Sequence, residues 1–276
     1  MEIGLSTHLF VNQRLSSHIL DQILAAGIRS IEIFAARQHL DYHDANHVRD
    51  TAQWFSDHDV RLHSLHAPVF SDFESGRTGG LPVSLAHTEK RHRIDSMDEV
   101  KRAIETAERL PFRFLVTHLG LADDDYSPGK FDAAFSSLEH LKVFARERGV
   151  SILIENTPGE LGAPERLAEF LRYTRLDLKV CFDTGHAHLT GGVQEGFRAL
   201  KPLIATVHLH DNLGEKDDHL LPFEGDIQWD PLIDSLQELN GAVASSLLEP
   251  GDCEAQGPAM PRVADVLRKL RRSEPA

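Results

Sequence analysis

The stretch "KVCFDTGHAH", residues 179–188, joins an apolar run to an acid and two histidines. The apolar residues at its start are typical of a buried strand, and Asp183, His186 and His188 follow where that strand ends. Buried acids and histidines cost free energy unless another group pairs with them. The stretch therefore predicts either an unusually polar strand end or part of a metal site, and the rest of the chain decides between these two.

The same unit, a short strand followed by a helix, recurs along the whole chain. Short β-branched runs alternate with segments whose apolar residues recur every three or four positions, as they do on one face of a helix. This alternation predicts a parallel sheet built from βαβ units. The expected strands are EIGLST (2–7), SIEIFA (30–35), RLHSLHAP (61–68), RFLVTHLG (113–120), SILIENT (151–157), KVCFDTGH (179–186), ATVHLHD (205–211) and SSLLEP (245–250).

Eight such units in about 250 residues predict an α/β fold of the (β/α)8 TIM-barrel type. We expect a single domain over residues 1–276, with only the last few residues frayed. A doubly wound open sheet is the alternative, but no glycine-rich dinucleotide fingerprint follows the first strand. Two long loops, 69–86 and 212–228, follow the third and seventh strands, on the face where barrel enzymes carry their sites.

The composition is that of a folded protein with an acidic surface. Hydrophobic residues make up 41% of the 276 residues, which is enough for a full core. The net charge of −14 argues against a broad phosphate-binding surface, so nucleic acid is not the expected partner. The chain has no apolar stretch near the ~20 residues that span a bilayer, and its N-terminus lacks a signal-peptide pattern. We therefore expect a cytoplasmic protein without a membrane partner.

Acids and histidines stand at or just past the ends of six consecutive predicted strands, the third to the eighth. In a barrel these ends meet on one face, and imidazole and carboxylate are ligands of divalent metals. Taken singly, each residue has an ordinary explanation: Asp183 is a good helix N-cap, and Glu155 is a typical solvated acid. Acids or histidines at six consecutive strand ends are hard to attribute to chance, so the set as a whole favours a metal site. Its members are His66, His118, Glu155, Asp183, His186, His208, His210, Asp217, His219 and Glu249.

The motifs around these residues resemble those of the xylose-isomerase-like TIM-barrel superfamily. That group contains sugar and sugar-phosphate isomerases and epimerases, and also the endonuclease IV family. The resemblance runs through nearly the whole chain in order, and it identifies the superfamily rather than one substrate. The motifs are SLHAP, LVTHLG, ILIENT, CFDTGHA, VHLHDN, DDHLLPFEGDIQW and LLEP.

In the epimerase branch, the resemblance implies one divalent ion held by two glutamates, an aspartate and a histidine. These roles fall on Glu155, Asp183, His208 and Glu249. His210 lies on the same face of its strand as His208 and stays an alternative ligand. In this interpretation Glu155 and Glu249 are the catalytic acid and base, and His186 orients a substrate oxygen.

In the endonuclease IV branch, the resemblance implies three zinc ions and a larger ligand set. Every position of that set has a matching residue type here. The ligands would be His66, His118, Glu155, Asp183, His186, His208, Asp217, His219 and Glu249. This larger set predicts a site with two or three ions.

Two departures from the superfamily pattern bear on the choice between the epimerase and the endonuclease IV interpretation. The loop after the seventh strand usually reads Gly-Glu-Gly, whereas here Phe223 replaces the first glycine. The endonuclease branch grips DNA with loops that carry arginine and tyrosine. Here the loop after the third strand, VFSDFESGRTGG, is acidic and lacks such a tyrosine, and the loops after the first two strands, HLFVNQR and AARQHLDYHD, offer little basic surface.

We therefore expect a metal-dependent isomerase or epimerase that acts on a sugar, sugar phosphate or related polyol or keto compound through an enediolate. The alternative is a multinuclear zinc phosphodiester hydrolase that cleaves DNA at abasic sites, and a barrel that merely binds a sugar is a third reading. The expected cofactor is a divalent ion (Mn, Zn, Co or Mg), and the expected partner is a small carbohydrate. Homo-oligomerisation, the substrate's identity and its phosphorylation are left open.

Overall fold

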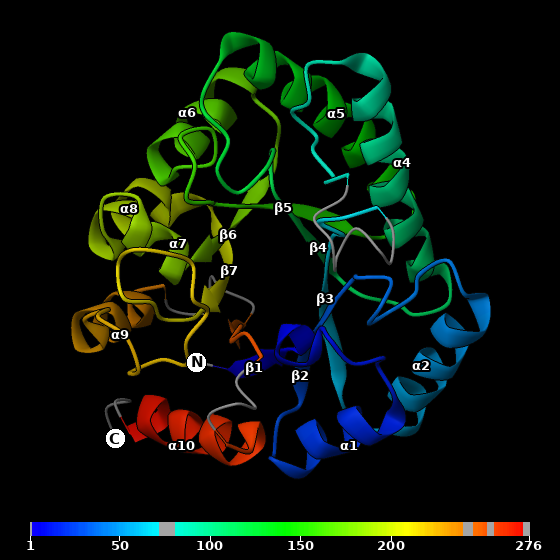
Figure 1. The fold of residues 1–276 in the computed structure, drawn as a ribbon, viewed down its shortest axis with the longest axis vertical. Coiled ribbons are helices and arrows are strands. Elements are labelled where there is room, and N and C mark those ends of the chain that lie inside the picture. Colours follow the sequence, from blue (N-terminus) through cyan, green and yellow to red (C-terminus); the bar gives the residue numbers. More distant parts are fainter. Residues whose placement is uncertain (1, 72–80, 240–244, 253–256, 273–276) are drawn as a thin grey trace.

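The computed structural model describes residues 2–71, 81–239, 245–252 and 257–272. Eight parallel strands close into a barrel in chain order, which confirms the predicted (β/α)8 fold (Figure 1). Seven of the strands fall within the runs that the sequence predicted, and β7 begins at Ile204, one residue before its predicted run. The strands are β1 (Ile3–Ser6), β2 (Ser30–Phe34), β3 (Arg61–His66), β4 (Phe114–Thr117), β5 (Ser151–Glu155), β6 (Lys179–Asp183), β7 (Ile204–Leu209) and β8 (Ser246–Leu248).

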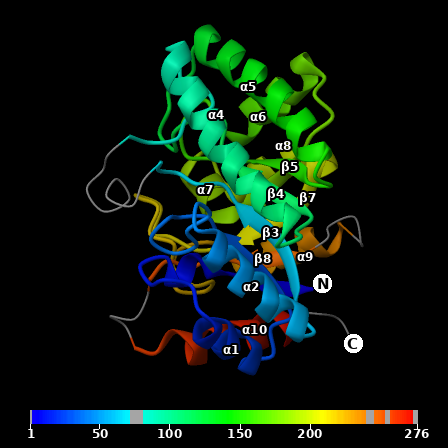
Figure 2. The same cartoon turned by 90° about the vertical axis from the view of Figure 1, so that its right-hand side faces the viewer.

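The helices form a ring around the barrel, and Figure 2 shows α4 and α5 side by side on its outside. The α-helices are α1 (Ser17–Ala25), α2 (Ala45–Asp57), α4 (Lys90–Glu105), α5 (Pro128–Arg146), α6 (Pro164–Thr174), α7 (Thr184–Leu189), α8 (Val193–Leu200), α9 (Trp229–Gln237) and α10 (Ala259–Arg272). The 3-10 segments of the described residues are η1 (Thr7–Phe10), η2 (Thr106–Glu108) and η3 (Lys201–Leu203). Within the described residues, no helix combines the length and the apolar character that crossing a bilayer demands.

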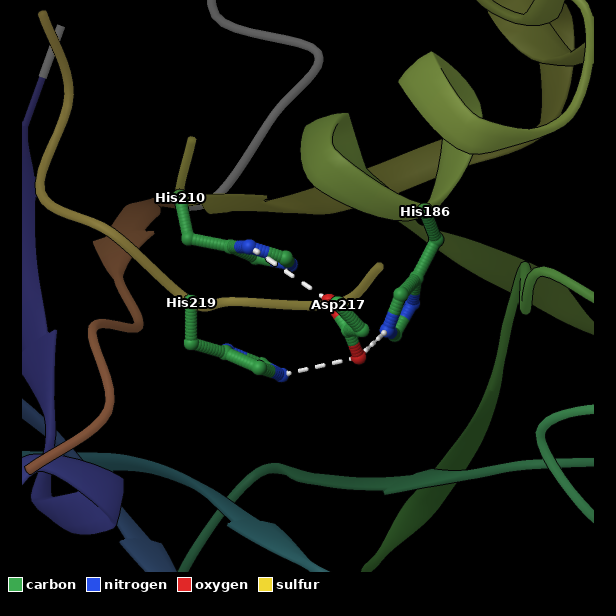
Figure 3. A group of neighbouring side chains, drawn as sticks. All are labelled: His186, His210, Asp217 and His219. Atoms are coloured by element: carbon green, nitrogen blue, oxygen red, sulfur yellow. Dashed lines mark hydrogen bonds and ion pairs between the residues drawn. The ribbon is translucent and has the colours of Figure 1, made fainter. Parts of the chain in front are cut away.

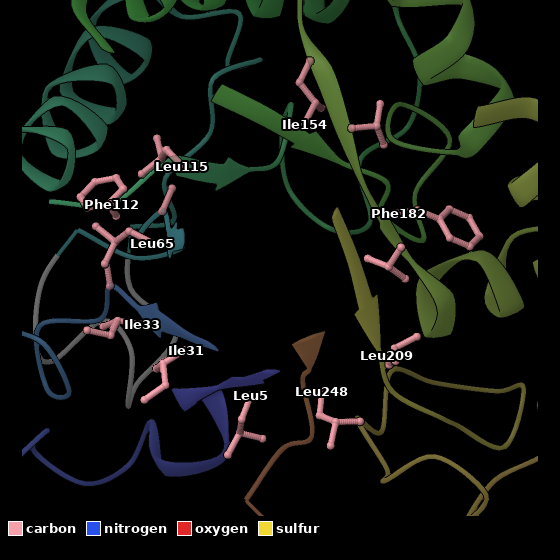
Figure 4. Packing of buried hydrophobic residues seen from close by; sticks show 14 of the residues in the cluster. Leu5, Ile31, Ile33, Leu65, Phe112, Leu115, Ile154, Phe182, Leu209 and Leu248 are labelled. Carbon is pink, nitrogen blue, oxygen red and sulfur yellow. The ribbon is translucent and has the colours of Figure 1, made fainter. Parts of the chain in front are cut away.

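Successive residues of each strand face opposite sides of the barrel wall. This alternation separates the apolar residues that pack against the helices from the residues that point inside the barrel. Outward-facing residues such as Ile31, Ile33 and Leu65 pack under the helices (Figure 4). Phe114, Val116, Leu153 and Cys181 form a small second cluster of buried side chains, and their places between the outward residues put them inside the barrel. Residues in phase with this inner set therefore reach the inside of the barrel at the carboxyl ends of the strands.

Two register shifts adjust which residues meet inside the barrel. Between β6 and β7, the partner of Val180 is Ile204 but the partner of Cys181 is Thr206, so β7 carries one extra residue. Because of this shift, Asp183 lies opposite His208. A similar shift between β2 and β3 gives β3 an extra residue and pairs Glu32 with Ser64.

A buried histidine connects the segments that follow β1 and β2. The ring of His39 is fully buried: its Nδ1 lies 2.6 Å from the carbonyl oxygen of Gln13, and its Nε2 lies 2.9 Å from the hydroxyl of Thr7. That hydroxyl also accepts a hydrogen bond from the Phe34 backbone N–H at 3.1 Å. The Gln13 carbonyl can only accept, so Nδ1 carries the proton; in the neutral ring Nε2 then accepts a hydrogen bond from the Thr7 hydroxyl. Burial lowers the pKa of His39 from 6.5 to about 4.

We predict that His39 makes the fold less stable in mild acid. The unfolded chain binds a proton at His39 below pH 6.5, whereas the folded chain does so only near pH 4, so stability falls as the pH falls between these values. In His39→Gln, the loss of unfolding free energy between pH 7.5 and pH 5 should be smaller than in the wild type by about 2 kcal/mol. Urea titrations at the two pH values measure it. The exposed His18→Gln variant is the control, and equal losses in His39→Gln and the wild type would refute the prediction.

Candidate metal centre

All nine predicted ligands, and His210 with them, lie together at the carboxyl ends of the strands and in the loop after β7. Their potential ligand atoms form three groups, and within each group these atoms lie within 4.8 Å of one another. We name these the carboxylate group (Glu155, Asp183, His208, Glu249), the histidine group (His186, His210, Asp217, His219) and the linking group (His66, His118, Glu155).

The carboxylate group surrounds one nitrogen of a fully buried histidine. His208 Nδ1 lies 2.7 Å from Glu155 Oε1, 3.0 Å from Glu249 Oε2 and 4.0 Å from Asp183 Oδ2. Asp183 Oδ2 is buried and has no hydrogen-bond partner among the described residues. Of the two candidate histidines from the seventh strand, the structure thus places His208 in this group. His210 lies in the histidine group.

Asp183 serves two purposes with its two oxygens. Its Oδ1 accepts a hydrogen bond of 2.7 Å from the His186 backbone N–H, so Asp183 is the N-cap of α7. Its Oδ2 remains directed at the carboxylate group. Asp183 is therefore the N-cap of α7, and this role leaves its second oxygen free for the predicted role as a metal ligand. His188, which follows His186 by two residues on α7, lies outside the three groups. Its Nδ1 lies 2.7 Å from Asn212 Oδ1.

Glu32, on β2, orients His208 from the other side of its ring, and sequence reasoning missed it. His208 Nε2 lies 3.1 Å from the Glu32 carboxylate, which also accepts a 2.7 Å hydrogen bond from the Ser64 hydroxyl. With Nε2–H donating to Glu32, Nδ1 is the nitrogen that faces the carboxylate group and is free to bind a metal ion or a second proton. The available signal in the sequence was an acid inside the otherwise apolar strand SIEIF.

Glu155 connects two of the groups through separate oxygens. Its Oε2 lies 3.0 Å from His66 Nε2 and 3.1 Å from His118 Nε2, whereas its Oε1 faces His208. A carboxylate with this arrangement can bridge two metal ions.

In the histidine group, three imidazole rings surround one carboxylate (Figure 3). His186 Nε2 and His219 Nε2 lie 3.0 Å and 3.2 Å from Asp217 Oδ2, and His210 Nδ1 lies 3.9 Å from Asp217 Oδ1. His186 comes from α7, and His210 follows β7. Asp217 and His219 come from the long loop after β7.

Backbone carbonyl groups fix the orientation of several of these rings. The Nδ1 atoms of His66, His186 and His219 each lie 2.8 Å from a backbone carbonyl oxygen, of Ala67, Asn156 and Glu249 respectively. A carbonyl accepts but cannot donate, so each Nδ1 carries a hydrogen. Nε2 then faces a carboxylate and is the nitrogen left to take up a second proton or to bind a metal ion.

The charge balance of the site also calls for cations. Five carboxylates meet here, those of Glu32, Glu155, Asp183, Asp217 and Glu249, and four of them are almost fully buried. In the described part of the chain, every ion pair that they form is with a histidine. Burial lowers the pKa of His219, but the hydrogen bond and charge of Asp217 outweigh it and raise that pKa to about 9. Divalent ions would supply the same positive charge, and this donor set fits Mn, Zn or Co.

The loop after β7 contains two non-glycine residues with left-handed backbone. His219 has φ 46°, and Phe223 has φ 74°. Phe223 therefore adopts the conformation that the expected glycine would favour, at a cost of about 1–2 kcal/mol. Its ring packs against Trp229, with ring centroids 5.4 Å apart. The loop thus keeps a glycine-type turn without the glycine.

Comparisons with known proteins agree with the fold. The family described as "Xylose isomerase-like TIM barrel" matches residues 20–270. An uncharacterized protein of Sinorhizobium fredii is 30% identical over 201 residues, which are 66% of this chain and 64% of that protein. An uncharacterized protein of Methanocaldococcus jannaschii is 29% identical, over 87% of this chain and 80% of its own length. A "Probable endonuclease 4" of Haloarcula marismortui is 27% identical, over 69% of this chain and 70% of that protein.

Solved structures resemble the whole chain in fold. A "D-tagatose 3-epimerase-like protein" has a TM-score of 0.78 at 24% identity, covering 99% of this chain and 97% of that one. The "IOLI protein with a binding zinc atom" has a TM-score of 0.79 at 18% identity, covering 98% and 96%. At these identities the likeness concerns the fold.

We predict that Glu32 strengthens metal binding without touching the metal. In Glu32→Gln, metal affinity should fall about 10–100-fold, because the acceptor that orients His208 is weakened. Titration of zinc or manganese against a competing chelator measures this. Glu99→Gln is the matched control: Glu99 is also buried and accepts a hydrogen bond from Tyr42, but it lies outside the three groups. An unchanged affinity in Glu32→Gln would rule out the orienting role.

Proposed function

We propose that this chain, which belongs to the xylose isomerase-like TIM barrel family, is a metal-dependent isomerase or epimerase of a small carbohydrate. The observation that carries the proposal is the placement of two glutamates around one metal position. Glu155 ends β5, and Glu249 follows β8; their carboxylates lie 2.7 Å and 3.0 Å from the same nitrogen of His208. Two carboxylates at one position can remove a proton from a carbon and return one to it.

The carboxylate group would hold the metal, which when bound polarises a substrate carbonyl as a Lewis acid. Glu249 is the better candidate for the base, because both oxygens of Glu155 already face histidines. Glu249 takes the proton from the carbon next to the carbonyl, which leaves an enediolate. Return of a proton to the opposite face of that carbon gives an epimer, and its delivery to the neighbouring carbon gives an isomer.

For His186 we propose a metal-binding role in place of the predicted orientation of a substrate oxygen. Its Nδ1 is held by the Asn156 carbonyl, and its Nε2 faces Asp217 at 3.0 Å. This geometry favours His186 as a ligand within the histidine group. We therefore assign acid–base chemistry to the glutamates alone.

A specific observation also favours a second function, hydrolysis of phosphoesters. The linking group and the carboxylate group share Glu155, so two ions could lie side by side there, with the histidine group adjacent. Clustered ions of this kind activate water and stabilise the leaving oxygen. The "Probable endonuclease 4" relative is consistent with such a reaction.

The described parts of the loops around the site offer little positive charge for a nucleic acid. Arg37, in the loop after β2, lies 3.5 Å from Asp41, and Lys216, in the loop after β7, lies 3.1 Å from Asp218. The net charge of the chain is −14. DNA binding depends on unpaired basic side chains that displace counterions. For this reason the small-carbohydrate function is the primary proposal.

We predict that Glu249→Gln stops the exchange of substrate hydrogen with solvent. The metal-loaded protein would be incubated in heavy water with a panel of ketoses, aldoses and their phosphates, and deuterium uptake would be followed by mass spectrometry. Uptake seen with the wild type should fall at least about 100-fold in the variant, because an amide cannot serve as the base. The metal content of both proteins is measured in parallel, so that loss of the ion is not mistaken for loss of the base.

Glu215→Gln, which changes an exposed acid in the loop after β7, is the matched control and should exchange like the wild type. Retained exchange in Glu249→Gln would contradict the assignment of the base. Nicking of abasic DNA by the wild type, together with no exchange on any sugar, would instead establish the second function.

A further inference from the structure

A pocket lies at the amino-terminal end of the barrel, away from the metal centre. It has a volume of about 310 Å³ and lies between the end of α5 and the beginnings of β5 and β6. The site residues Glu155 and Asp183 are the last residues of these two strands. A strand rises about 3.3 Å per residue, so the first residue of each strand lies about 13 Å from its last. The pocket is therefore separate from the site described above.

Apolar residues line the deep part of the pocket, and basic residues stand at its rim. The almost completely buried residues of the lining are Phe114, Val150, Ile152, Leu153 and Leu178. The basic residues Lys142, Arg146 and Lys179 are more exposed. A pocket of this size with an apolar lining and a few polar groups is the common form of a small-molecule site.

The rim carries an excess of positive charge. Its charged residues are Lys142, Arg146, Lys179 and one acid, Asp177. Lys142 and Arg146 have no ion-pair or hydrogen-bond partner among the described residues. Lys179 Nζ donates a 3.1 Å hydrogen bond to the carbonyl oxygen of Pro202, which leaves two of its three N–H groups for another partner. This local excess stands in a chain whose net charge is −14.

The two cations on α5 differ from a basic neighbour that is paired with an acid. Arg148, two residues beyond the end of α5, places its Nε 3.1 Å from Glu108 Oε1. Lys142 and Arg146 are four residues apart on the helix, so their like charges lie next to each other and repel. Arg146 also balances the negative end of the helix dipole, but Lys142 lies one turn farther from that end. An anion in the pocket would offset the repulsion between the two.

We infer that this pocket binds a small organic anion. Its charged group would lie between Lys142 and Arg146, and its apolar part would lie against Val150 and Leu178. Carboxylate and phosphate are the two groups whose oxygens match the guanidinium fork of Arg146. The apolar lining would strengthen the attraction, because walls of low dielectric constant concentrate the field of the cations. The inference does not depend on the reaction at the metal centre.

Methyl NMR of the metal-loaded protein tests this inference, because an aromatic ring shifts the methyl signals that it contacts. Benzoate and phenyl phosphate are the probes, and benzamide is the neutral analogue. The methyl signals of Val150 and Leu178 should move with one or both anions and stay in place with benzamide. The anion that binds more tightly identifies the preferred charged group. The signals of Leu209, which is next to His208, should stay in place throughout.

The affinity for the anion should fall at least about 10-fold in the double variant Lys142→Gln/Arg146→Gln, because hydrogen bonds from charged donors are lost. The double variant Lys90→Gln/Arg91→Gln is the matched control. It removes one lysine and one arginine from exposed positions in the first turn of α4, outside the pocket, and should bind like the wild type. Circular dichroism confirms that both variants are folded.

Three results would overturn the inference: no movement of Val150 and Leu178 with either anion, equal movement with benzamide, or unchanged affinity in folded Lys142→Gln/Arg146→Gln. Movement of Leu209 alone would place the anion at the metal centre and would also overturn it. Failure of the proposed reaction would show separately, as an absence of hydrogen exchange in a wild type whose pocket binds the anion.

Discussion

Five carboxylates meet at one end of the barrel, and in the described part of the chain only histidines neutralise them. Buried negative charges cannot persist without compensating positive charge, which must come from protons on the histidines or from metal ions. The backbone carbonyls of Ala67, Asn156 and Glu249 fix which nitrogen of each nearby ring is available. The remaining nitrogen of each fixed ring therefore faces the carboxylates, where it can carry a proton or bind a metal ion.

The barrel supplies this geometry through the two-residue period of its strands. On β6, Val180 and Phe182 pack outward under the helices, whereas Cys181 and Asp183 face inward. The same apolar residues that hold the helices against the barrel therefore set the direction of the ligands. Stability and chemistry are thus assigned to alternate residues of the same strand, and changes to the outward set affect the site through packing alone.

The fold and most of the site were predictable from the sequence, because both rest on local patterns. When a predicted strand ends in an acid or a histidine, as the sixth strand does at Asp183, that residue is expected at the carboxyl end of the barrel. Glu32 was missed because its partner, His208, lies 176 residues away on β7, and one strand gives no sign of the other. The distinction between His208 and His210 also needed coordinates, since both face inward on one strand and differ only in the neighbours they meet.

The extra residues in β3 and β7 limit how this protein can change in length over evolution. A deletion within β7 would slide its later residues by one position, and because the side-chain period is two, Leu209 would then enter the site while His208 turned toward the helices. Insertions in the loops cause no such inversion. Lineages that keep this centre should therefore vary in loop length while conserving the spacing between each register shift and the ligand that follows it.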